Sequence, residues 1–140
     1  MDRLSSTGML VARILLSHVF LLSGAKKVFA FSATQAHMTK YGMKMTGLFL
    51  VLAILFEIGG GLMLLLGTFP RLGALALLLF LLPATVVFHR DFADPAQIVQ
   101  FSKNVAIMGG LWAVLAAGGG EFALPGRKRE AAGTRRGMVK

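Results

Sequence analysis

The feature that most constrains the fold is a single carboxylate inside a long apolar run. Glu57 is the only charged residue between Lys44 and Arg71. The segment from Met45 to Pro70 is otherwise apolar or small, and it is long enough to cross a bilayer. A carboxylate at the middle of such a run is costly if it faces lipid. Glu57 is therefore expected to face a protein interior or a wet cavity, with a partner.

The composition is that of a membrane protein. Of 140 residues, 56% are hydrophobic and only 15% are charged, and the mean hydropathy is +0.72. A soluble domain of this length needs more polar surface than that. The apolar residues also come in long blocks rather than along one face of an amphipathic repeat, which favours spanning helices.

Four apolar blocks predict an all-α integral membrane protein, a bundle of four transmembrane helices in one domain over residues 1–120. At about 1.5 Å per residue, each block reaches or approaches the hydrocarbon thickness of roughly 30 Å. The predicted spans are 8–25, 46–68, 72–88 and 98–117. The loop after the first span, 26–45, contains aromatic and methionine residues, and we expect it to be partly ordered, with an interfacial helix.

The positive charge does not indicate nucleic-acid binding. The net charge is +9, but six basic residues lie in the tail 121–140: Arg127, Lys128, Arg129, Arg135, Arg136 and Lys140. The tail is interpreted as a solvated cytoplasmic segment attracted to anionic lipid headgroups. Together with Arg3 and Arg71, it gives the side that holds both termini more basic charge than the opposite side, so the positive-inside rule predicts cytoplasmic termini.

The absence of cysteine limits the possible redox chemistry. It excludes disulfides, thiol catalysis, cysteine-ligated iron–sulfur clusters and covalently attached c-type haem. A bis-histidine haem is not expected, because His18 lies near mid-membrane whereas His37 and His89 lie toward the outer surface. The outer residues match no metal-ligand spacing, so no metal site is predicted. Electron chemistry would need a diffusible carrier or the cofactor of a partner.

Small residues at four-residue spacing mark helix contact faces in lipid. In the second span this spacing includes Glu57, between Ala53 and Gly61, which places the carboxylate against a neighbouring helix. The fourth span has such a stripe as well, which is expected to serve packing alone: Gly109, Ala113 and Ala117.

Depth along the helices suggests partners for the carboxylate. If the first span begins near Gly8, Arg13 lies roughly 8 Å and His18 roughly 15 Å into the membrane, and Glu57 also lies at roughly 15 Å. Arg13 is predicted to pair with Glu57, because an unpaired arginine at that depth is costly. His18 alone is expected to be a hydrogen-bonded interior residue. The pair is either a lock that fixes helix register or a functional site, and both interpretations stay open.

Several segments together resemble the DoxX family of small bacterial membrane proteins. The pieces are Arg13, the segments 21–27, 57–67 and 70–75, Ala84-Thr85 leading to His89, and 101–106 followed by Gly109-Gly110. The likeness covers about residues 8–120 and excludes the tail.

The resemblance implies a four-helix bundle of the bacterial inner membrane. Family members are associated with quinone-linked oxidation, notably as a membrane subunit of thiosulfate:quinone oxidoreductase, and with complexes that handle oxidative stress. The residues that carry over are Arg13, Lys27, Glu57, Arg71, His89, Lys103 and Asn104.

A quinone-linked subunit is the first functional hypothesis. Glu57 and Arg13 are the candidate catalytic residues, and the candidate quinone-binding residues are His18, Lys27, His89, Lys103 and Asn104. The alternative is a non-catalytic accessory subunit of a larger membrane complex. A small transporter has little support, because the chain shows no inverted repeats. The expected partners are lipids and either other subunits or further copies of this chain.

Overall fold

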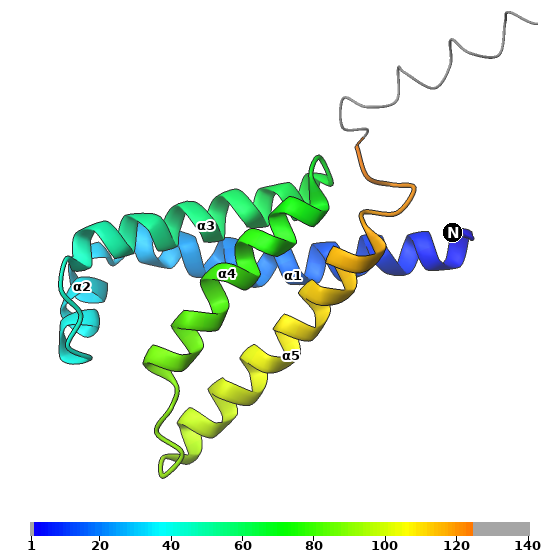
Figure 1. Cartoon of the computed structure of the whole chain (residues 1–140). Coiled ribbons are helices and arrows are strands. Elements are labelled where there is room, and N and C mark those ends of the chain that lie inside the picture. Colours follow the sequence, from blue (N-terminus) through cyan, green and yellow to red (C-terminus); the bar gives the residue numbers. More distant parts are fainter. Residues whose placement is uncertain (1, 125–140) are drawn as a thin grey trace, which may run out of the picture.

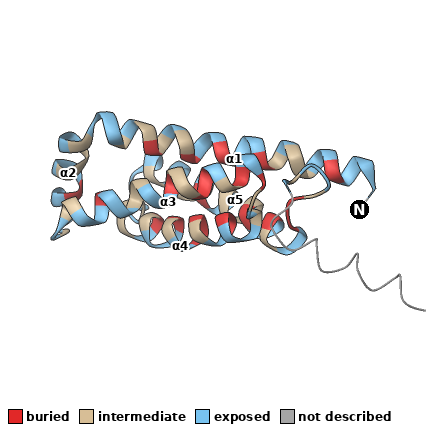
Figure 2. Cartoon of the chain, turned by 90° about the horizontal axis from the view of Figure 1, so that it is seen from above, coloured by how far each residue is buried: buried red, intermediate tan, exposed pale blue. Residues whose placement is uncertain are grey.

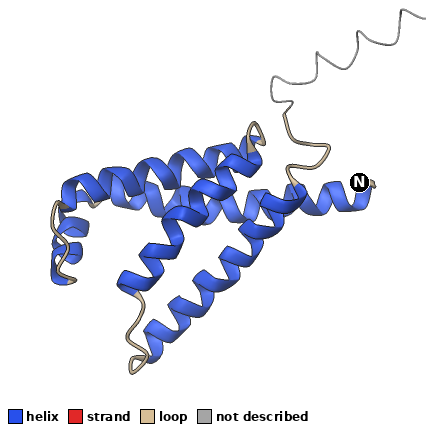
Figure 3. Cartoon of the chain, viewed as in Figure 1, coloured by secondary structure: helices blue, strands red, loops and turns tan. Residues whose placement is uncertain are grey.

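The chain folds into helices joined by short connections. A computed structural model describes residues 2–124, and within them there is no strand (Figure 3). The helices are α1 (Arg3–Phe29), α2 (Phe31–Lys40), α3 (Thr46–Leu66), α4 (Pro70–Phe88) and α5 (Pro95–Ala117). All except α2 are long and apolar enough to cross a membrane. The predicted all-α class with four spans is confirmed. The basic residues of the predicted tail lie outside the described residues.

α1 begins earlier than the apolar block suggests because it has a cap. The carboxylate of Asp2 accepts a hydrogen bond from the Ser5 amide at 2.9 Å, which satisfies a free N–H of the first turn. The hydrogen bonds from the Ser5 hydroxyl and amide lower the pKa of Asp2, so its charge complements the positive end of the helix dipole at neutral pH. The helix therefore extends from Arg3 to Phe29, beyond the predicted span on both sides.

The loop predicted between the first two spans contains a helix, α2. The ring of His37 in α2 and the ring of Tyr41, directly after α2, pack against the far end of α4: their centroids lie 5.9 and 5.0 Å from that of Phe88. Only Met38 of this helix is buried. The end of the molecule formed by α2 is therefore joined to α4 by aromatic contacts.

The four spans form a closed ring. α1 packs on α3, α3 on α4, α4 on α5, and α5 returns to α1. α1 and α3 lie side by side, and the hairpin of α4 and α5 runs obliquely to them (Figure 1). The start of α1 and the end of α5 lie toward the same end of the bundle, opposite α2 (Figure 1). This is the four-helix bundle expected from the sequence.

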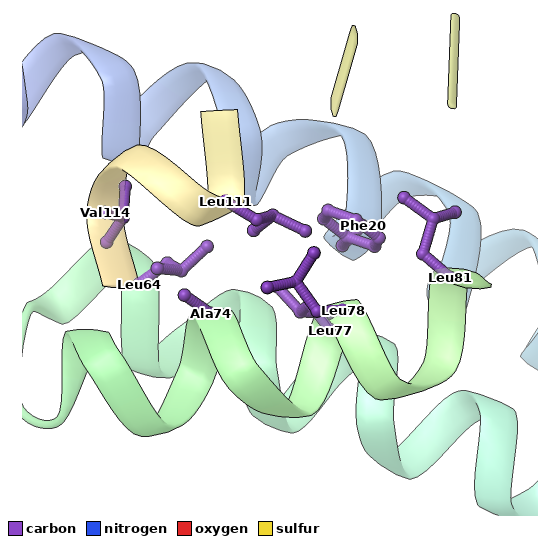
Figure 4. Close-up of a cluster of buried hydrophobic side chains, with 8 residues drawn as sticks. All are labelled: Phe20, Leu64, Ala74, Leu77, Leu78, Leu81, Leu111 and Val114. Carbon is purple, nitrogen blue, oxygen red and sulfur yellow. The ribbon is translucent and has the colours of Figure 1, made fainter. Parts of the chain in front are cut away.

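Side chains from all four spans fill the centre of this ring (Figure 4). A single cluster contains Phe20, Leu64, Ala74, Leu77, Leu78, Leu81, Leu111 and Val114. Most other large apolar side chains point outward, so buried residues form only narrow stripes on each helix (Figure 2). An outward apolar surface is what a bundle with lipid as its solvent requires.

Close backbone approach sets the register between α1 and α3. A Cβ placed on Gly24 would lie 2.7 Å from Cγ1 of Ile58 and 3.3 Å from Cβ of Glu57, so α1 passes α3 with no room for a side chain there. Further along, Leu21 lies against Gly61, and Arg13 reaches Gly67. The register therefore places Gly24, not His18, opposite Glu57.

The predicted packing role of the small-residue stripe on α5 is not found among residues 2–124. Gly109, Ala113 and Ala117 are exposed, and a Cβ on Gly109 would meet no atom within 4 Å. α5 instead turns Leu111 and Val114 inward. These larger side chains reach the core, so the small residues face outward.

Replacing Gly24 with alanine should separate α1 from α3. The new methyl group would overlap the Ile58 side chain, and we expect a loss of about 1–3 kcal/mol in the free energy of unfolding. Reversible unfolding in mixed micelles, followed by circular dichroism, measures this. Gly59→Ala in α3 is the matched control, because a Cβ there meets nothing within 4 Å. Equal losses in both variants would contradict the close approach.

Candidate functional site: a buried carboxylate held by Ser23 and Lys27

Glu57 is buried in the bundle, as predicted. Its relative exposure is 3%, and its partners come from α1. The Ser23 hydroxyl donates to Oε1 at 2.8 Å, and Lys27 Nζ lies 3.1 Å from Oε1 and 2.9 Å from Oε2. The carboxylate therefore has the cationic neighbour from the adjoining span that its position demands.

The two partners reach Glu57 because of their spacing on α1. Ser23 and Lys27 are four residues apart and share one helix face. Side chains on a helix lean toward its N-terminus, so Lys27, near the end of α1, extends back toward the middle of the bundle. Its Nζ also donates to the Ser23 hydroxyl at 2.8 Å. The three side chains form one connected polar group.

The two oxygens of the Glu57 carboxylate differ in their hydrogen bonds. Oε1 accepts hydrogen bonds from Ser23 and Lys27. Oε2 is buried and lies within ion-pair distance of Lys27, yet no donor meets hydrogen-bond geometry at this atom within residues 2–124. Such an atom retains the capacity to accept a proton or a hydrogen bond. The Lys27 side chain is 24% exposed, so the group is accessible from one side.

The predicted Arg13–Glu57 ion pair is wrong. Arg13 is 1% exposed and donates to backbone carbonyls instead: Nε to Leu64 at 2.8 Å, Nη2 to Leu65 at 3.1 Å, and Nη1 to Gly119 at 2.7 Å. The carbonyls in the last turn of α3 have no partner within their own helix, and their negative dipole end attracts a cation. Arg13 therefore caps α3 and ties it to the chain after α5.

The prediction failed because the register was misplaced. It aligned Gly8 with the end of α3 near Gly67, whereas the side chain of Arg13 reaches Gly67. The observed contact of Gly24 with Glu57 differs by six residues from the predicted match at His18, which is about 9 Å along a helix. The shift carries Arg13 away from Glu57, to the end of α3.

A second arginine makes a related contact at the same end. Arg71, near the start of α4, donates from Nη2 to the Ala116 carbonyl in the last turn of α5 at 3.2 Å. Neither α3 nor α5 has a basic residue in its own last turn. An arginine from an adjacent antiparallel helix supplies the positive charge in each case. Arg71 is exposed, whereas Arg13 is buried.

The other predicted binding residues do not join the Glu57 group. Asn104 is buried and donates to the Thr85 hydroxyl at 3.0 Å, which links α5 to α4. His89 Nδ1 lies 2.8 Å from Oε1 of Gln97 across the α4–α5 turn. Lys103 is exposed on α5. A quinone-binding role for these residues stays a prediction.

His18 is not an interior residue, which corrects the expectation drawn from its depth. It is exposed on the outer face of α1, and its neighbours Leu15 and Leu22 are 64% and 47% exposed. The inward face of this helix carries Ser17 and Phe20 instead.

Sequence reasoning missed Ser23, Thr85 and Gln97 as polar partners. The four-residue spacing of Ser23 and Lys27 was available as a signal, because both lie on the face of α1 that includes Gly24. For Thr85 and Gln97 no pattern in the chain points to a partner, since each meets a residue from the other helix of the α4–α5 hairpin.

A shallow groove lies at the other end of the bundle from α2. It has a volume of ≈ 530 Å³ and is lined by the α3–α4 turn, the start of α4 and residues 117–119. Arg71 is its charged lining residue, and no member of the Glu57 group borders it. The groove is therefore separate from the candidate site.

The four apolar spans and the interior ion pair define a small multi-pass membrane protein, and the relatives place it in the bacterial inner membrane. The DoxX family model matches residues 8–90, which cover most of α1 and all of α2, α3 and α4. Inner membrane protein YqjF of Escherichia coli (strain K12) is 36% identical over 124 residues, which are 89% of this chain and 94% of YqjF. The chain therefore belongs to the DoxX family.

A second relative supports the same assignment. Inner membrane protein YphA of Escherichia coli (strain K12) is 28% identical over 125 residues, 85% of this chain and 89% of YphA. No solved structure matches the chain.

Loss of the Arg13 guanidinium should destabilise the bundle strongly. Arg13→Met keeps a long side chain but leaves three buried or half-buried carbonyls without a donor. We therefore expect the free energy of unfolding to fall by about 3 kcal/mol or more. Arg71→Met is the matched control: it removes one exposed contact and should cost less than about 1 kcal/mol. Unfolding in mixed micelles measures both. A smaller effect at position 13 than at position 71 would refute the capping role.

Proposed function

We propose that this protein is the membrane subunit of a quinone-linked oxidoreductase, and that Lys27, Ser23 and Glu57 receive the quinone headgroup. The observation that carries the proposal is the buried Oε2 of Glu57, which lacks a hydrogen bond beside a partly exposed ammonium group. An ionisable group inside a membrane span is by default a candidate for function.

The residues present fit a quinone headgroup. A quinone carbonyl accepts hydrogen bonds, which the Lys27 ammonium donates, and a quinol hydroxyl donates one, which the Glu57 carboxylate accepts. When bound, a quinone takes up two electrons and two protons to become a quinol. The chain has no cysteine, so the electrons come from a redox group on a partner subunit.

The same group offers a route for protons. Lys27 Nζ, Ser23 Oγ and Glu57 Oε1 are joined by successive contacts of 2.8 Å, from a partly exposed side chain to one that is 3% exposed. A positioned acid or base within hydrogen-bond reach is the requirement for general acid–base catalysis. Glu57 is the only carboxylate within α1, α3, α4 or α5, so this route has no alternative acid at that depth.

A non-catalytic accessory subunit is the second candidate, and Arg13 favours it. Arg13, the other residue predicted to be catalytic, donates a hydrogen bond from each of its three guanidinium nitrogens to a backbone carbonyl. An arginine so engaged holds helices together and has little capacity to act on a ligand. If Glu57 and Lys27 also serve only to hold helices together, their ion pair fixes the register between α1 and α3.

Neutralising Glu57 separates the two candidates. Glu57→Gln keeps the size and the acceptor for Ser23 but removes the negative charge. We expect about a 100-fold loss of thiosulfate-dependent reduction of a short-chain quinone in membranes that contain the whole complex. Lys27→Met should lower quinone retained by the purified protein, measured by solvent extraction.

Lys26→Met is the matched control, because Lys26 is adjacent in sequence but exposed. It should change neither turnover nor bound quinone. Unchanged turnover in Glu57→Gln, together with a lower unfolding temperature or assembly yield, would refute the proposed chemistry and support the accessory subunit.

A further inference from the structure

One histidine faces outward from the middle of a span. His18 lies near the centre of α1 and is exposed. None of the hydrogen bonds found among residues 2–124 involves its imidazole. By contrast, the hydroxyls of Ser17 and Ser23 on the same helix each donate a hydrogen bond. A polar group that faces hydrocarbon without a partner is costly, so a partner from outside the chain is expected.

His18 lies within a regular outward stripe of α1. The stripe is formed by Gly8, Val11, Leu15, His18 and Leu22, with alternating spacings of three and four residues. This is the spacing of a coiled-coil seam, although a lipid-facing stripe can share it. One member distinguishes the stripe from a lipid surface, namely the histidine, since the open space at Gly8 recurs at Gly59 and Gly109 on other helices.

We propose that a second copy of this chain covers the stripe, in a parallel dimer with α1 packed on α1. Copies of one membrane protein insert with the same orientation, so a two-fold axis along the membrane normal brings equal depths together. His18 of each copy then faces its counterpart. A neutral imidazole has one N–H donor and one acceptor nitrogen, so two of them are complementary to each other.

A second copy explains the observations better than a bound quinone. Small-molecule sites are concave and surround the ligand, whereas His18 stands on the convex outer surface of one helix, between exposed Leu15 and Leu22. A single polar residue in an apolar seam is also the feature that fixes register and oligomeric state in helix pairs.

Cysteine cross-linking tests the dimer directly, because the natural chain has no cysteine. Leu15→Cys and Leu22→Cys, oxidised in native membranes, should convert most of the protein to a disulfide-linked species of twice the mass. Leu55→Cys on α3 and Leu79→Cys on α4 are matched controls with similar exposure, 61% and 62%, on other helices. They should remain monomeric.

The histidine is then tested within the Leu15→Cys protein. His18→Leu should lower the cross-linked fraction at least fivefold, and His18→Asn, whose amide also pairs with itself, should retain it. Co-expression of two differently tagged copies identifies the adduct as a homodimer. Absence of cross-linking, equal cross-linking at the α3 and α4 controls, an adduct of another mass, or no effect of His18→Leu would each overturn the proposal.

Discussion

The antiparallel contact of α1 with α3 is the constraint on which the rest of the structure depends. It holds because Gly24 lets the two backbones approach at Glu57 and Ile58. Once this contact is fixed, the contacts of both buried charges follow: Ser23 and Lys27 flank the carboxylate, and Arg13 lies at the end of α3. A slip of one turn, about 5.4 Å, would separate both charged groups from their partners. In a bundle without a strong hydrophobic force between its helices, such polar contacts specify register.

The two buried charges are satisfied in different ways. Glu57 has a formal counter-ion, Lys27, and a neutral donor, Ser23. Arg13 has no carboxylate partner among the described hydrogen bonds and ion pairs; it meets the partial negative charge of a helix end. Its position is therefore determined by where α3 ends, which in turn depends on Gly67 in the left-handed conformation, φ 70°. A Cβ at that position would overlap the guanidinium. The Glu57 contact leaves one oxygen without a hydrogen bond, whereas the Arg13 contact uses all three nitrogens.

The sequence predicted the fold class, the four spans and the burial of Glu57, because hydropathy and the cost of a charge in lipid act on individual segments. It predicted the wrong partner, because a partner depends on the register between two segments. That register is set by the passage of Gly24 past Glu57 and Ile58, and one glycine among many in the chain is a weak signal for it. The exposure of His18 and of the Gly109 stripe was missed for a different reason, which concerns helix faces. Periodicity identifies faces of a helix, but it does not identify which face meets a neighbour when most faces are apolar.

The different chemistry of lysine and arginine explains why the two sites are not equivalent. An arginine fork has a fixed, planar set of donors and stays charged, so it suits the three fixed carbonyls around Arg13. A lysine is a compact charge on a flexible stem and exchanges its contacts readily. At position 27 it reaches Ser23 and both oxygens of Glu57 while its side chain stays 24% exposed. An arginine there would engage the carboxylate through two parallel hydrogen bonds and leave neither oxygen free. The lysine therefore keeps the carboxylate paired while one of its oxygens makes no hydrogen bond, and this distinguishes the Glu57 group, as a candidate site, from the Arg13 cap.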